Sequence, residues 1–375
     1  MEYRRSVRSG LDIGVIGMGA SSVGQSSRKD IQRIVEYALG RGVNYFDLAA
    51  GDSAPFAAYG DALAATGMRD KVYFQLHFGA LYDSGSYAWT TSLEKIKRSV
   101  DWQLRNLRTD YIDFGFIHCL DEESDLDAYL GGGVLDYILE LKRQGVVRRL
   151  GLSTHTPALA EKVLDMGIID MLMFSINPGY DWHEGEYANG RTDERQHLYC
   201  RCEAEGVGIS VMKPFSSGQL LDARTSPFRR ALTEYQCIKY ALDRPGVLTV
   251  LPGIRSLEDL ERVLGYFDAS DEEKDYSEIY GFAPPRTEGV CVYCNHCSPC
   301  PRHIDIGLVN KYYDLARVGD KLAVSHYLTL GHKADECVSC GHCNRRCPFG
   351  VDQQARMREI AEYFSRCSAG AEEKI

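Results

Sequence analysis

Eight cysteines gathered in two runs near the end of the chain constrain its fold more than any other feature of the sequence. The runs are Cys291, Cys294, Cys297 and Cys300, followed by Cys337, Cys340, Cys343 and Cys347. Each run ends in a Cys-Pro pair, and the whole chain has thirteen cysteines. Cysteines of a chain that we expect to be cytoplasmic should not form disulfides, so this crowding indicates a small domain built around inorganic cofactors.

The spacing of the second run is that of the bacterial ferredoxins. Two-residue gaps let three thiolates converge on one face of a cubic cluster, while the fourth cysteine, followed by Pro348, comes from a segment that leaves in another direction. The first run is one residue shorter in its last gap. We therefore predict two [4Fe-4S] clusters. The alternative is a pair of structural zinc sites, which also use Cys-x-x-Cys pairs but rarely use runs of four that end in Cys-Pro.

The two runs are expected to share their ligands. In two-cluster proteins of this spacing, the fourth cysteine of one run ligates the other cluster. The expected sets are Cys291, Cys294, Cys297 and Cys347 for one cluster, and Cys337, Cys340, Cys343 and Cys300 for the other. Between the runs, apolar residues at helical spacing predict two short helices, at Ile306–Ala316 and Leu322–Leu328, and this segment resembles the helical ferredoxins.

The chain before the cysteine runs alternates short β-type runs with amphipathic helical stretches from residue 11 to about 266. The eight predicted strands are Ile13–Met18, Val43–Asp47, Val72–His77, Tyr111–His118, Val147–Ser153, Ile169–Ser175, Val207–Met212 and Leu248–Leu251. Eight such units predict an α/β protein with a closed (β/α)8 TIM barrel over residues 1–275, followed by a small, mainly helical two-cluster domain over residues 276–375.

In a barrel of this kind the reaction site lies at the carboxy ends of the strands. Those ends carry a set of polar side chains, namely Asp47, His77, His118, Ser153, His155, Asn177 and Lys213. A single buried histidine or aspartate is more often a structural group. Several ionisable residues converging on one barrel mouth favour a functional site instead.

These strand ends resemble the aldo-keto reductase family, and more narrowly its bacterial members with an appended iron–sulfur domain. The segments that carry the resemblance are Gly42–Asp47, Asp110–Asp113 with His118, Gly151–Ser153, Val211–Pro214 and Pro252–Ser256. The resemblance implies hydride transfer between NAD(P)H and a carbonyl, with an aspartate, a tyrosine acid, a lysine and a histidine at the mouth. Asp47 and His118 match two of these four residues.

The other two residues of the family's tetrad are replaced. Its tyrosine falls on Asp52 and its lysine falls on His77, so the predicted catalytic set is Asp47, Asp52, His77 and His118. Asp52 beside His77 would favour an ion pair, which leaves His77 or His118 as the expected acid. We predict Tyr59 to be the sole phenol near the site, but it lies inside the helix at Phe56–Ala65 and is not assigned as the acid.

The resemblance also implies a dinucleotide groove that binds NADP(H) or NAD(H). Its expected residues are Ser153, Asn177, Lys213, Gly218, Gly253 and Arg255. Arg255 favours NADP, because a fork of N–H donors matches a phosphate group. The family's carboxamide-binding glutamine is Met173 here, and its stacking aromatic residue is Met212.

Three functions are consistent with the sequence. The first is an oxidoreductase that acts on a small hydroxylated or aromatic carbonyl or alcohol, with two clusters for electron transfer and a ferredoxin or flavoprotein as redox partner. Nicotinamide moves two electrons and a cluster moves one, so this function needs a transducer. The second is a non-redox lyase, dehydratase or epimerase that uses the Asp/Asp/His/His site, with or without a metal ion, beside structural or sensory clusters. The third is an electron-transfer or sensor protein whose barrel has lost catalysis.

Composition excludes other classes of partner. A net charge of −10 argues against nucleic acid, whose binding needs clustered Lys and Arg. No apolar run approaches the roughly 18 residues of a membrane span. The amino terminus, Met1–Arg5, lacks the features of a secretory signal, so we expect a cytoplasmic location. The cysteines outside the two runs are predicted to be packing residues, and they are Cys119, Cys200, Cys202, Cys237 and Cys367.

Overall fold

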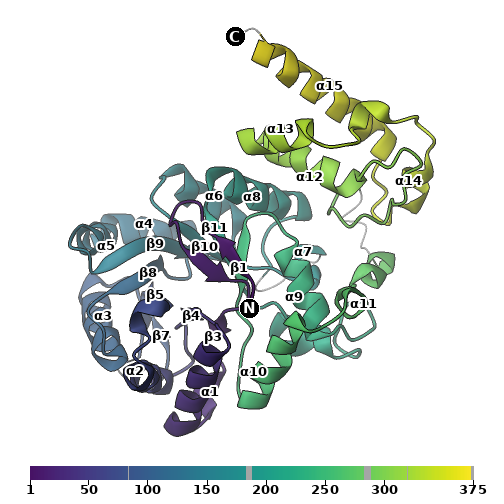
Figure 1. The fold of residues 1–375 in the computed structure, drawn as a ribbon. Helices are drawn as coiled ribbons and strands as arrows, with labels where there is room; N and C mark the ends of the chain where they lie inside the picture. Colours follow the sequence, from purple (N-terminus) through teal and green to yellow (C-terminus); the bar gives the residue numbers. More distant parts are fainter. Residues whose placement is uncertain (83, 183–187, 283–288, 319, 373–375) are drawn as a thin grey trace.

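The computed structural model describes residues 1–82, 84–182, 188–282, 289–318 and 320–372, and its centre is a parallel sheet surrounded by helices (Figure 1). The eight strands, in the order of neighbours, are β12 (Val247–Val250), β11 (Gly208–Met212), β10 (Met171–Ser175), β9 (Val147–Ser153), β8 (Ile112–Ile117), β5 (Tyr73–Phe78), β4 (Tyr45–Asp47) and β3 (Met18–Gly19). The sheet closes where the Gly17 N–H donates to the Val250 carbonyl at 2.9 Å and the Val250 N–H donates to the Val15 carbonyl at 2.9 Å. The predicted (β/α)8 barrel is therefore confirmed.

The first predicted strand, Ile13–Met18, is divided in two. Its start belongs to β2 (Asp12–Gly14), which pairs antiparallel with β1 (Tyr3–Arg5) in an amino-terminal hairpin. The guanidinium of Arg4 fixes this hairpin to the barrel by donating to the Leu242 and Val247 carbonyls. Ile13 then packs into the barrel interior, and only the short β3 remains for the parallel sheet.

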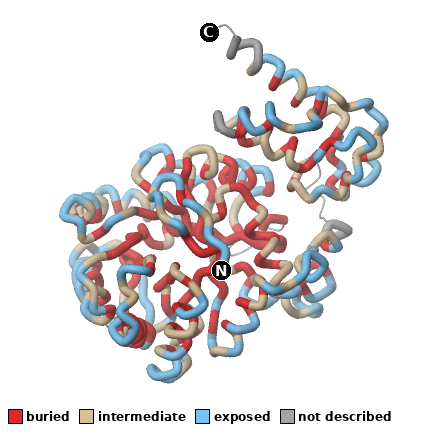
Figure 2. The backbone as a smooth tube through the Cα atoms, viewed as in Figure 1, coloured by how far each residue is buried: buried red, intermediate tan, exposed pale blue. Residues whose placement is uncertain are grey.

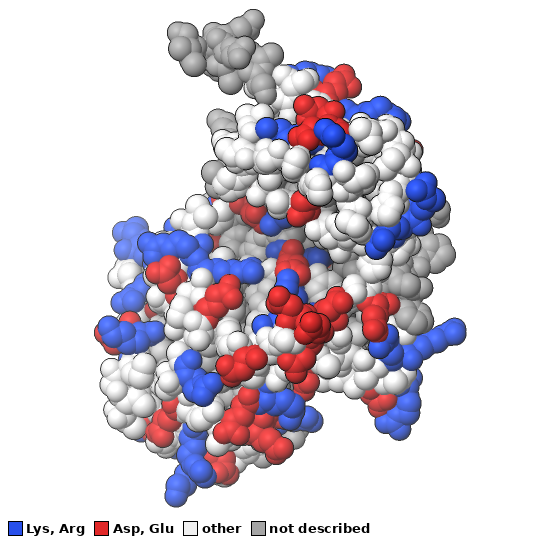
Figure 3. All heavy atoms as spheres, turned by 45° about the vertical axis from the view of Figure 1, so that its right-hand side comes forward, with Lys and Arg blue, Asp and Glu red and all other residues white. Residues whose placement is uncertain are grey.

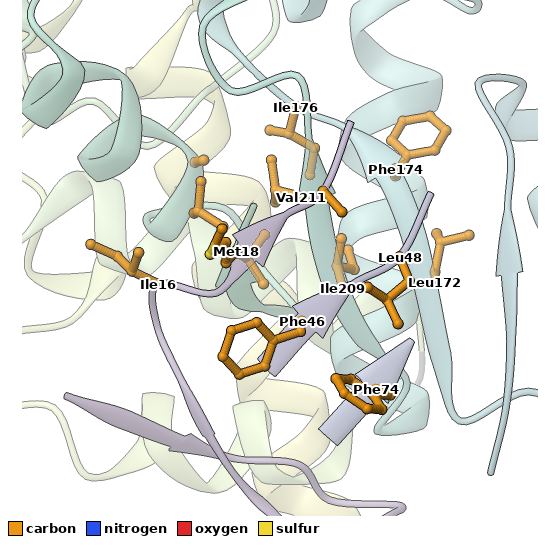
Figure 4. Close-up of a cluster of buried hydrophobic side chains, with 14 of the residues drawn as sticks. Ile16, Met18, Phe46, Leu48, Phe74, Leu172, Phe174, Ile176, Ile209 and Val211 are labelled. Carbon is orange, nitrogen blue, oxygen red and sulfur yellow. The ribbon is translucent and has the colours of Figure 1, made fainter. Parts of the chain in front are cut away.

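Side chains alternate along the strands between two cores, as the pleat of a β-strand requires. Phe46, Phe74, Leu172 and Ile209 lie in the core between strands and helices (Figure 4). The interior of the barrel is filled mainly by residues of the other face, namely Tyr45, Phe114, Phe116, Met171 and Met173 with Ile13 and Leu251. Figure 2 shows the buried strands at the centre and the exposed outer faces of the helices.

The helices around the barrel alternate with the strands. They are α1 (Arg28–Gly40), α2 (Ala54–Thr66), α3 (Leu93–Leu107), α4 (Glu123–Gly131), α5 (Val134–Arg143), α6 (Pro157–Asp165), α7 (Pro178–Trp182), α8 (Thr192–Glu205), α9 (Glu234–Leu242) and α10 (Leu257–Leu264). The first residue of α6 is a proline, whose missing N–H costs nothing at that position. No helix in the described ranges is both long enough and apolar enough to cross a membrane.

The carboxy-terminal domain is helical, as predicted from the segment between the cysteine runs. Its helices are α12 (Ile306–Arg317), α13 (Lys321–Leu328), α14 (His342–Arg346) and α15 (Gln353–Glu372). The residues that follow the predicted domain boundary at 275 and 276 still contact the barrel. The Tyr276 hydroxyl donates to Asp243 Oδ2 at 2.7 Å, and Ile279 is buried in the barrel core.

The cluster domain packs against the barrel through α7, α8 and α9. Val292 and Phe349 join the barrel core, and the Trp182 and Phe349 rings meet edge to face with centroids 5.5 Å apart. The Arg244 guanidinium donates to the Val292 carbonyl at 3.0 Å. On the face that Figure 3 shows, acidic and basic side chains are interspersed over both domains, so this face offers no extended basic surface.

Candidate active site at the barrel mouth

A chain of hydrogen bonds runs outward from the barrel interior at the carboxy ends of β4, β5 and β8. His77 Nε2 lies 2.7 Å from Asp47 Oδ1, and His77 Nδ1 lies 2.9 Å from His118 Nδ1. The outer nitrogen of His118, Nε2, lies 2.9 Å from the Tyr87 hydroxyl. Asp47, His77 and His118 are 3%, 2% and 6% exposed, whereas Tyr87 is 41% exposed. The chain therefore links a buried carboxylate to a phenol at the surface.

Gln75 holds the inner end of this chain. Its side-chain oxygen accepts hydrogen bonds from the Tyr45 hydroxyl at 2.6 Å and the Ser210 hydroxyl at 3.0 Å. These two donors fix the amide so that Nε2 faces Asp47 Oδ1 at 3.1 Å and the Met173 sulfur at 3.0 Å. Gln75 was not among the predicted site residues, although its position two residues before His77 on the same face of β5 was a signal for it.

The electrostatics of the chain follow from burial. Burial, with the His77 and His155 imidazoles nearby, holds the pKa of His118 well below its usual range. A neutral imidazole has one N–H. If Tyr87 donates to His118 Nε2, then His118 Nδ1–H donates to His77, and His77 Nε2–H donates to Asp47. Burial, with a smaller effect of the Cys119 charge, raises the pKa of Tyr87 to about 12, so this phenol is protonated at neutral pH.

Tyr87 reaches His118 because the segment after β5 folds back as a hairpin. Its strands are β6 (Ala80–Leu81) and β7 (Ala88–Trp89), and the Trp89 indole N–H donates to the His118 carbonyl at 3.1 Å. The prediction that Tyr59 is the sole phenol near the site was therefore wrong. Tyr59 is buried against Phe46, with ring centroids 5.7 Å apart, and its hydroxyl has no hydrogen-bond partner among the described residues.

Asp52 follows β4 and its backbone forms an antiparallel bridge to Ser86, the residue before Tyr87. Its Oδ1 accepts the Ala54 N–H at 2.8 Å, and a Cβ added to Gly24 would lie 2.3 Å from its Oδ2. Within the described ranges, no hydrogen bond or ion pair joins Asp52 to the Asp47–His77–His118 chain. The carboxylate beside His77 is thus Asp47, not Asp52 as expected. Asp52 packs in the space that a side chain at position 24 would need.

The residues predicted to bind a nucleotide lie along the ends of β9 to β12. Ser153 ends β9 and is buried. The Asn177 amide donates to the Lys213 carbonyl at 2.8 Å and accepts the Tyr180 N–H at 2.9 Å, so it joins the loops that follow β10 and β11. Positive φ angles occur at Lys213, Ser216, Ser217 and Gly218. These turns are closed by the Ser216 N–H, which donates to the Lys213 carbonyl at 3.0 Å, and by the Gly218 N–H, which donates to the Phe215 carbonyl at 2.9 Å.

The two outer nucleotide residues follow β12. The Gly253 backbone forms a bridge to Gly19, and a Cβ at position 253 would meet the Ser22 hydroxyl at 3.0 Å. The Arg255 side chain is 70% exposed, and its Nε lies 3.5 Å from Asp259 Oδ2. Its guanidinium therefore faces solvent beside the mouth, where a phosphate group could reach it.

The two cysteine runs come together, and Cys347 of the second run lies near cysteines of the first. Charges on Cys291, Cys294 and Cys347 add to burial in raising the pKa of Cys297. Charges on Cys337 and Cys340 act in the same way on Cys343. A small cavity lies between the two runs. The cysteines that line it are Cys297, Cys300, Cys337, Cys340 and Cys343.

This spacing fits cubic clusters better than zinc. Four thiolates around one zinc ion lie about 3.8 Å apart, because each zinc–sulfur bond is about 2.3 Å long. In the part of the chain that the structure describes, no three of the eight cysteine sulfurs lie within 4.8 Å of one another. The cysteines are therefore too far apart for a zinc tetrahedron and leave room for a larger inorganic core.

Comparison with protein families agrees with the fold. The model of the aldo/keto reductase family matches residues 15–234, which is more than half of the 375 residues. The chain belongs to the aldo/keto reductase family. A second model, of a 4Fe-4S dicluster domain, matches residues 290–352. The protein is thus an oxidoreductase of this family with a carboxy-terminal 4Fe-4S domain, as the resemblance implied.

Individual relatives cover the barrel. The uncharacterized oxidoreductase YqkF of Bacillus subtilis is 28% identical over 69% of this chain and 89% of its own length. L-galactose dehydrogenase of Arabidopsis thaliana is 22% identical over 70% of this chain and 86% of its own length. The holo form of the aldo-keto reductase AKR11C1 from Bacillus halodurans superposes with a TM-score of 0.60 at 23% identity, covering 76% of this chain and 97% of its own. The structural likeness shows the fold alone.

Proposed function

We propose that the protein interconverts a carbonyl and an alcohol on a small hydroxylated or aromatic substrate, with NADP(H) as the hydride carrier and Tyr87 as the group that exchanges a proton with the substrate oxygen. The observation that carries this proposal is the hydrogen-bond chain from Asp47 to Tyr87. Tyr87 is the one member of the chain with a substantially exposed side chain, so it can contact a substrate at the mouth.

Each residue of the chain has a role in this reaction. In reduction, Tyr87 donates its proton to the developing alkoxide and takes a new proton from solvent at the mouth, while His118 Nε2 accepts its hydrogen bond. In oxidation, Tyr87 accepts the alcohol proton and passes its own proton to His118 Nε2. Asp47 lies 2.7 Å from His77 Nε2, so its negative charge stabilises the positive charge that the two imidazoles then share. Gln75 keeps Asp47 in position. A bound nicotinamide would supply or accept the hydride.

The nucleotide would lie across the ends of β9 to β12. Ser153 would meet the carboxamide, and the loop from Lys213 to Gly218 would lie beside the pyrophosphate. The exposed guanidinium of Arg255 would pair with the phosphate that distinguishes NADP from NAD.

The two [4Fe-4S] clusters would exchange single electrons with a redox partner such as a ferredoxin or flavoprotein. The contact between the domains supports such a link to the mouth. Phe349 lies two residues after Cys347, and its ring packs on Trp182 of α7. The same short helix begins directly after Asn177 at the end of β10, so the domain that holds the clusters contacts a loop of the barrel mouth.

Turnover by anaerobic, cluster-loaded protein tests the proposal. NADPH, NADH or neither is added with a panel of small aldehydes and ketones, while nicotinamide and cluster absorbance are followed together. We expect substrate-dependent NADPH oxidation, and Tyr87→Phe should lower turnover by roughly 10²–10⁴, the usual contribution of a positioned acid–base group. His118→Ala should give a loss in the same range.

Tyr59→Phe is the matched control. It also removes a phenol hydroxyl, but from a buried ring that packs on Phe46 outside the chain. Turnover by this variant should equal that of the wild type. Equal rates for Tyr87→Phe and Tyr59→Phe would refute the role of Tyr87, and the absence of NADPH or NADH binding by calorimetry would refute the hydride reaction itself.

A further inference from the structure

Three side chains of different chemistry meet beside His118. Cys119 and Asp121 follow β8, and His155 follows β9. The His155 Nδ1 atom lies 2.8 Å from Asp121 Oδ2, and the Cys119 sulfur lies 3.6 Å from the same oxygen. All three potential ligand atoms lie within 4.8 Å of one another, and no other set of three in the described ranges meets this condition. Cys119 is among the cysteines that the sequence predicts to be packing residues.

The distances within this trio are those of a zinc site. With zinc–oxygen and zinc–nitrogen bonds of about 2.0 Å and a zinc–sulfur bond of about 2.3 Å, tetrahedral ligands lie about 3.3 Å (O to N) and about 3.5 Å (O to S) apart. The observed 2.8 and 3.6 Å are within about half an ångström of these values, so small side-chain movements would admit the ion. The trio therefore has the spacing that the eight cluster cysteines lack.

The carboxylate is oriented before any ion arrives. Asp121 Oδ1 accepts the His155 backbone N–H at 2.6 Å and the Thr154 hydroxyl at 3.1 Å. These bonds turn the other oxygen, Oδ2, toward His155 Nδ1 and Cys119. Hydrogen bonds to the second oxygen of a ligating carboxylate are the usual support of a metal ligand. The Leu120 N–H also donates to the Ser153 carbonyl at 3.1 Å, which ties the two loops together.

We propose that Cys119, Asp121 and His155 bind one Zn²⁺ whose fourth position receives the carbonyl oxygen of the substrate. Three protein ligands and one open position are typical of catalytic zinc, and the mixed sulfur, nitrogen and oxygen donors suit that ion. The trio adjoins the proton chain, because Cys119 directly follows His118 in the sequence. This inference rests on the proposed carbonyl reduction.

The chemistry balances without a further reactant. The hydride of the reduced nicotinamide adds to the carbonyl carbon, and the π electron pair moves onto the oxygen that zinc holds. Tyr87 then donates a proton to that oxygen, and the alcohol leaves. Zinc keeps its oxidation state and acts as a Lewis acid. It stabilises the negative oxygen, a task that the family's lysine and tyrosine share and that neither His77 nor Asp52 can perform in the same way.

Zinc binding is measured first, without any substrate. Anaerobic protein with both clusters loaded is mixed with Zn²⁺ and desalted, and its metals are counted. We expect about one zinc per chain in addition to the cluster iron, and X-ray absorption at the zinc edge should give one sulfur among nitrogen and oxygen ligands. Zinc in damaged cluster sites would give four sulfurs instead.

Variants locate the ion. Cys119→Ser and His155→Gln should each weaken zinc retention by at least about tenfold, and Thr154→Val, which removes a hydrogen bond to Asp121, should weaken it by about 10–100-fold. Cys367→Ser, which changes a free cysteine of α15, is the control and should retain zinc fully. Unchanged cluster absorbance verifies that each variant is folded.

The outcomes separate this inference from the proposed function. No retained zinc, four-sulfur coordination, or full zinc retention by Cys119→Ser would overturn the site. If zinc binds at the trio and Cys119→Ser reduces carbonyls as fast as the wild type, the Lewis-acid role is wrong and the reductase stands. If zinc binds and the wild type reduces no carbonyl with either nucleotide, the metal site stands, but the Lewis-acid role fails together with the proposed function.

Discussion

Asp181 forms the centre of a buried ionic network in α7, the short helix between the barrel mouth and the cluster domain. Its carboxylate accepts hydrogen bonds from Arg195 Nε at 2.9 Å, the Tyr199 hydroxyl at 2.7 Å and the Tyr240 hydroxyl at 2.8 Å. The side chains of Arg195 and Asp181 are 0% and 1% exposed. Replacement of Asp181 by Asn keeps the shape of the side chain but leaves the arginine charge buried without a counter-charge.

The expected loss of stability follows from that burial. Removing one partner of a buried ion pair costs about 3–5 kcal/mol, far more than breaking a surface pair. We therefore expect the free energy of unfolding to fall by about 3–5 kcal/mol in Asp181→Asn, and by a similar amount in Arg195→Met. The double variant should cost less than the sum of the two single variants by up to about 3 kcal/mol, because it removes both charges together.

Anaerobic urea unfolding of the cluster-loaded protein, followed by far-ultraviolet circular dichroism, measures these differences. Glu123→Gln breaks an exposed ion pair with Lys162 and serves as the control, with no measurable loss expected. Additive costs in the double variant, or a single-variant cost no larger than that of the control, would refute the reasoning. Trp182 directly follows Asp181 in the sequence, and its indole packs on Phe349. A shift of α7 in Asp181→Asn would alter this packing, so we expect the fluorescence of Trp182 to change as well.

Two further predictions concern the clusters and the altered tetrad. Cys347→Ser should lose the same cluster as Cys291→Ser, so that iron falls from about eight to about four per chain in both, and in the double variant as well; a double variant with no cluster left would show that the two cysteines serve different clusters. Asp52→Tyr together with His77→Lys restores the family's pattern and should give ordinary carbonyl reductase activity with loss of the native reaction. Both activities are measured with NADPH, the first on a simple aldehyde and the second on the native substrate. Unchanged native turnover in that double variant would mean that neither position takes part in catalysis.

Much of the scaffold could be predicted because its signals are periodic. Strand β5 reads as alternating inward and outward residues, so His77 could be placed at the mouth from the sequence alone. The cysteine spacing in the second run predicted the cluster domain equally well. The helices α12 and α13 followed from apolar residues at helical spacing.

The contacts within the mouth could not be predicted, because loops carry no period. Tyr87 meets His118 only when the β6–β7 hairpin folds back and Trp89 bonds to the His118 carbonyl. The position of Asp52 depends on a glycine 28 residues earlier in the chain, Gly24, which leaves space for its carboxylate. The first strand was misplaced for a related reason. Its residues suit both the hairpin and the barrel, and pairing with Arg4 decides between them.

The two substitutions in the tetrad are coupled by the geometry of an imidazole. A lysine at the end of β5 would have one ammonium group that can serve an aspartate and a phenol together. His77 has two ring nitrogens in fixed directions, and both are in use, one 2.7 Å from Asp47 and the other 2.9 Å from His118. A phenol at position 52 would find no nitrogen of residue 77 to bond. The ring nitrogen that can still bond to a phenol is then His118 Nε2, and the Tyr87 hydroxyl from the hairpin bonds to it. In the proposed reaction, a tyrosine at position 52 would therefore have no partner at residue 77, and the proton-donating phenol comes from the β6–β7 hairpin instead.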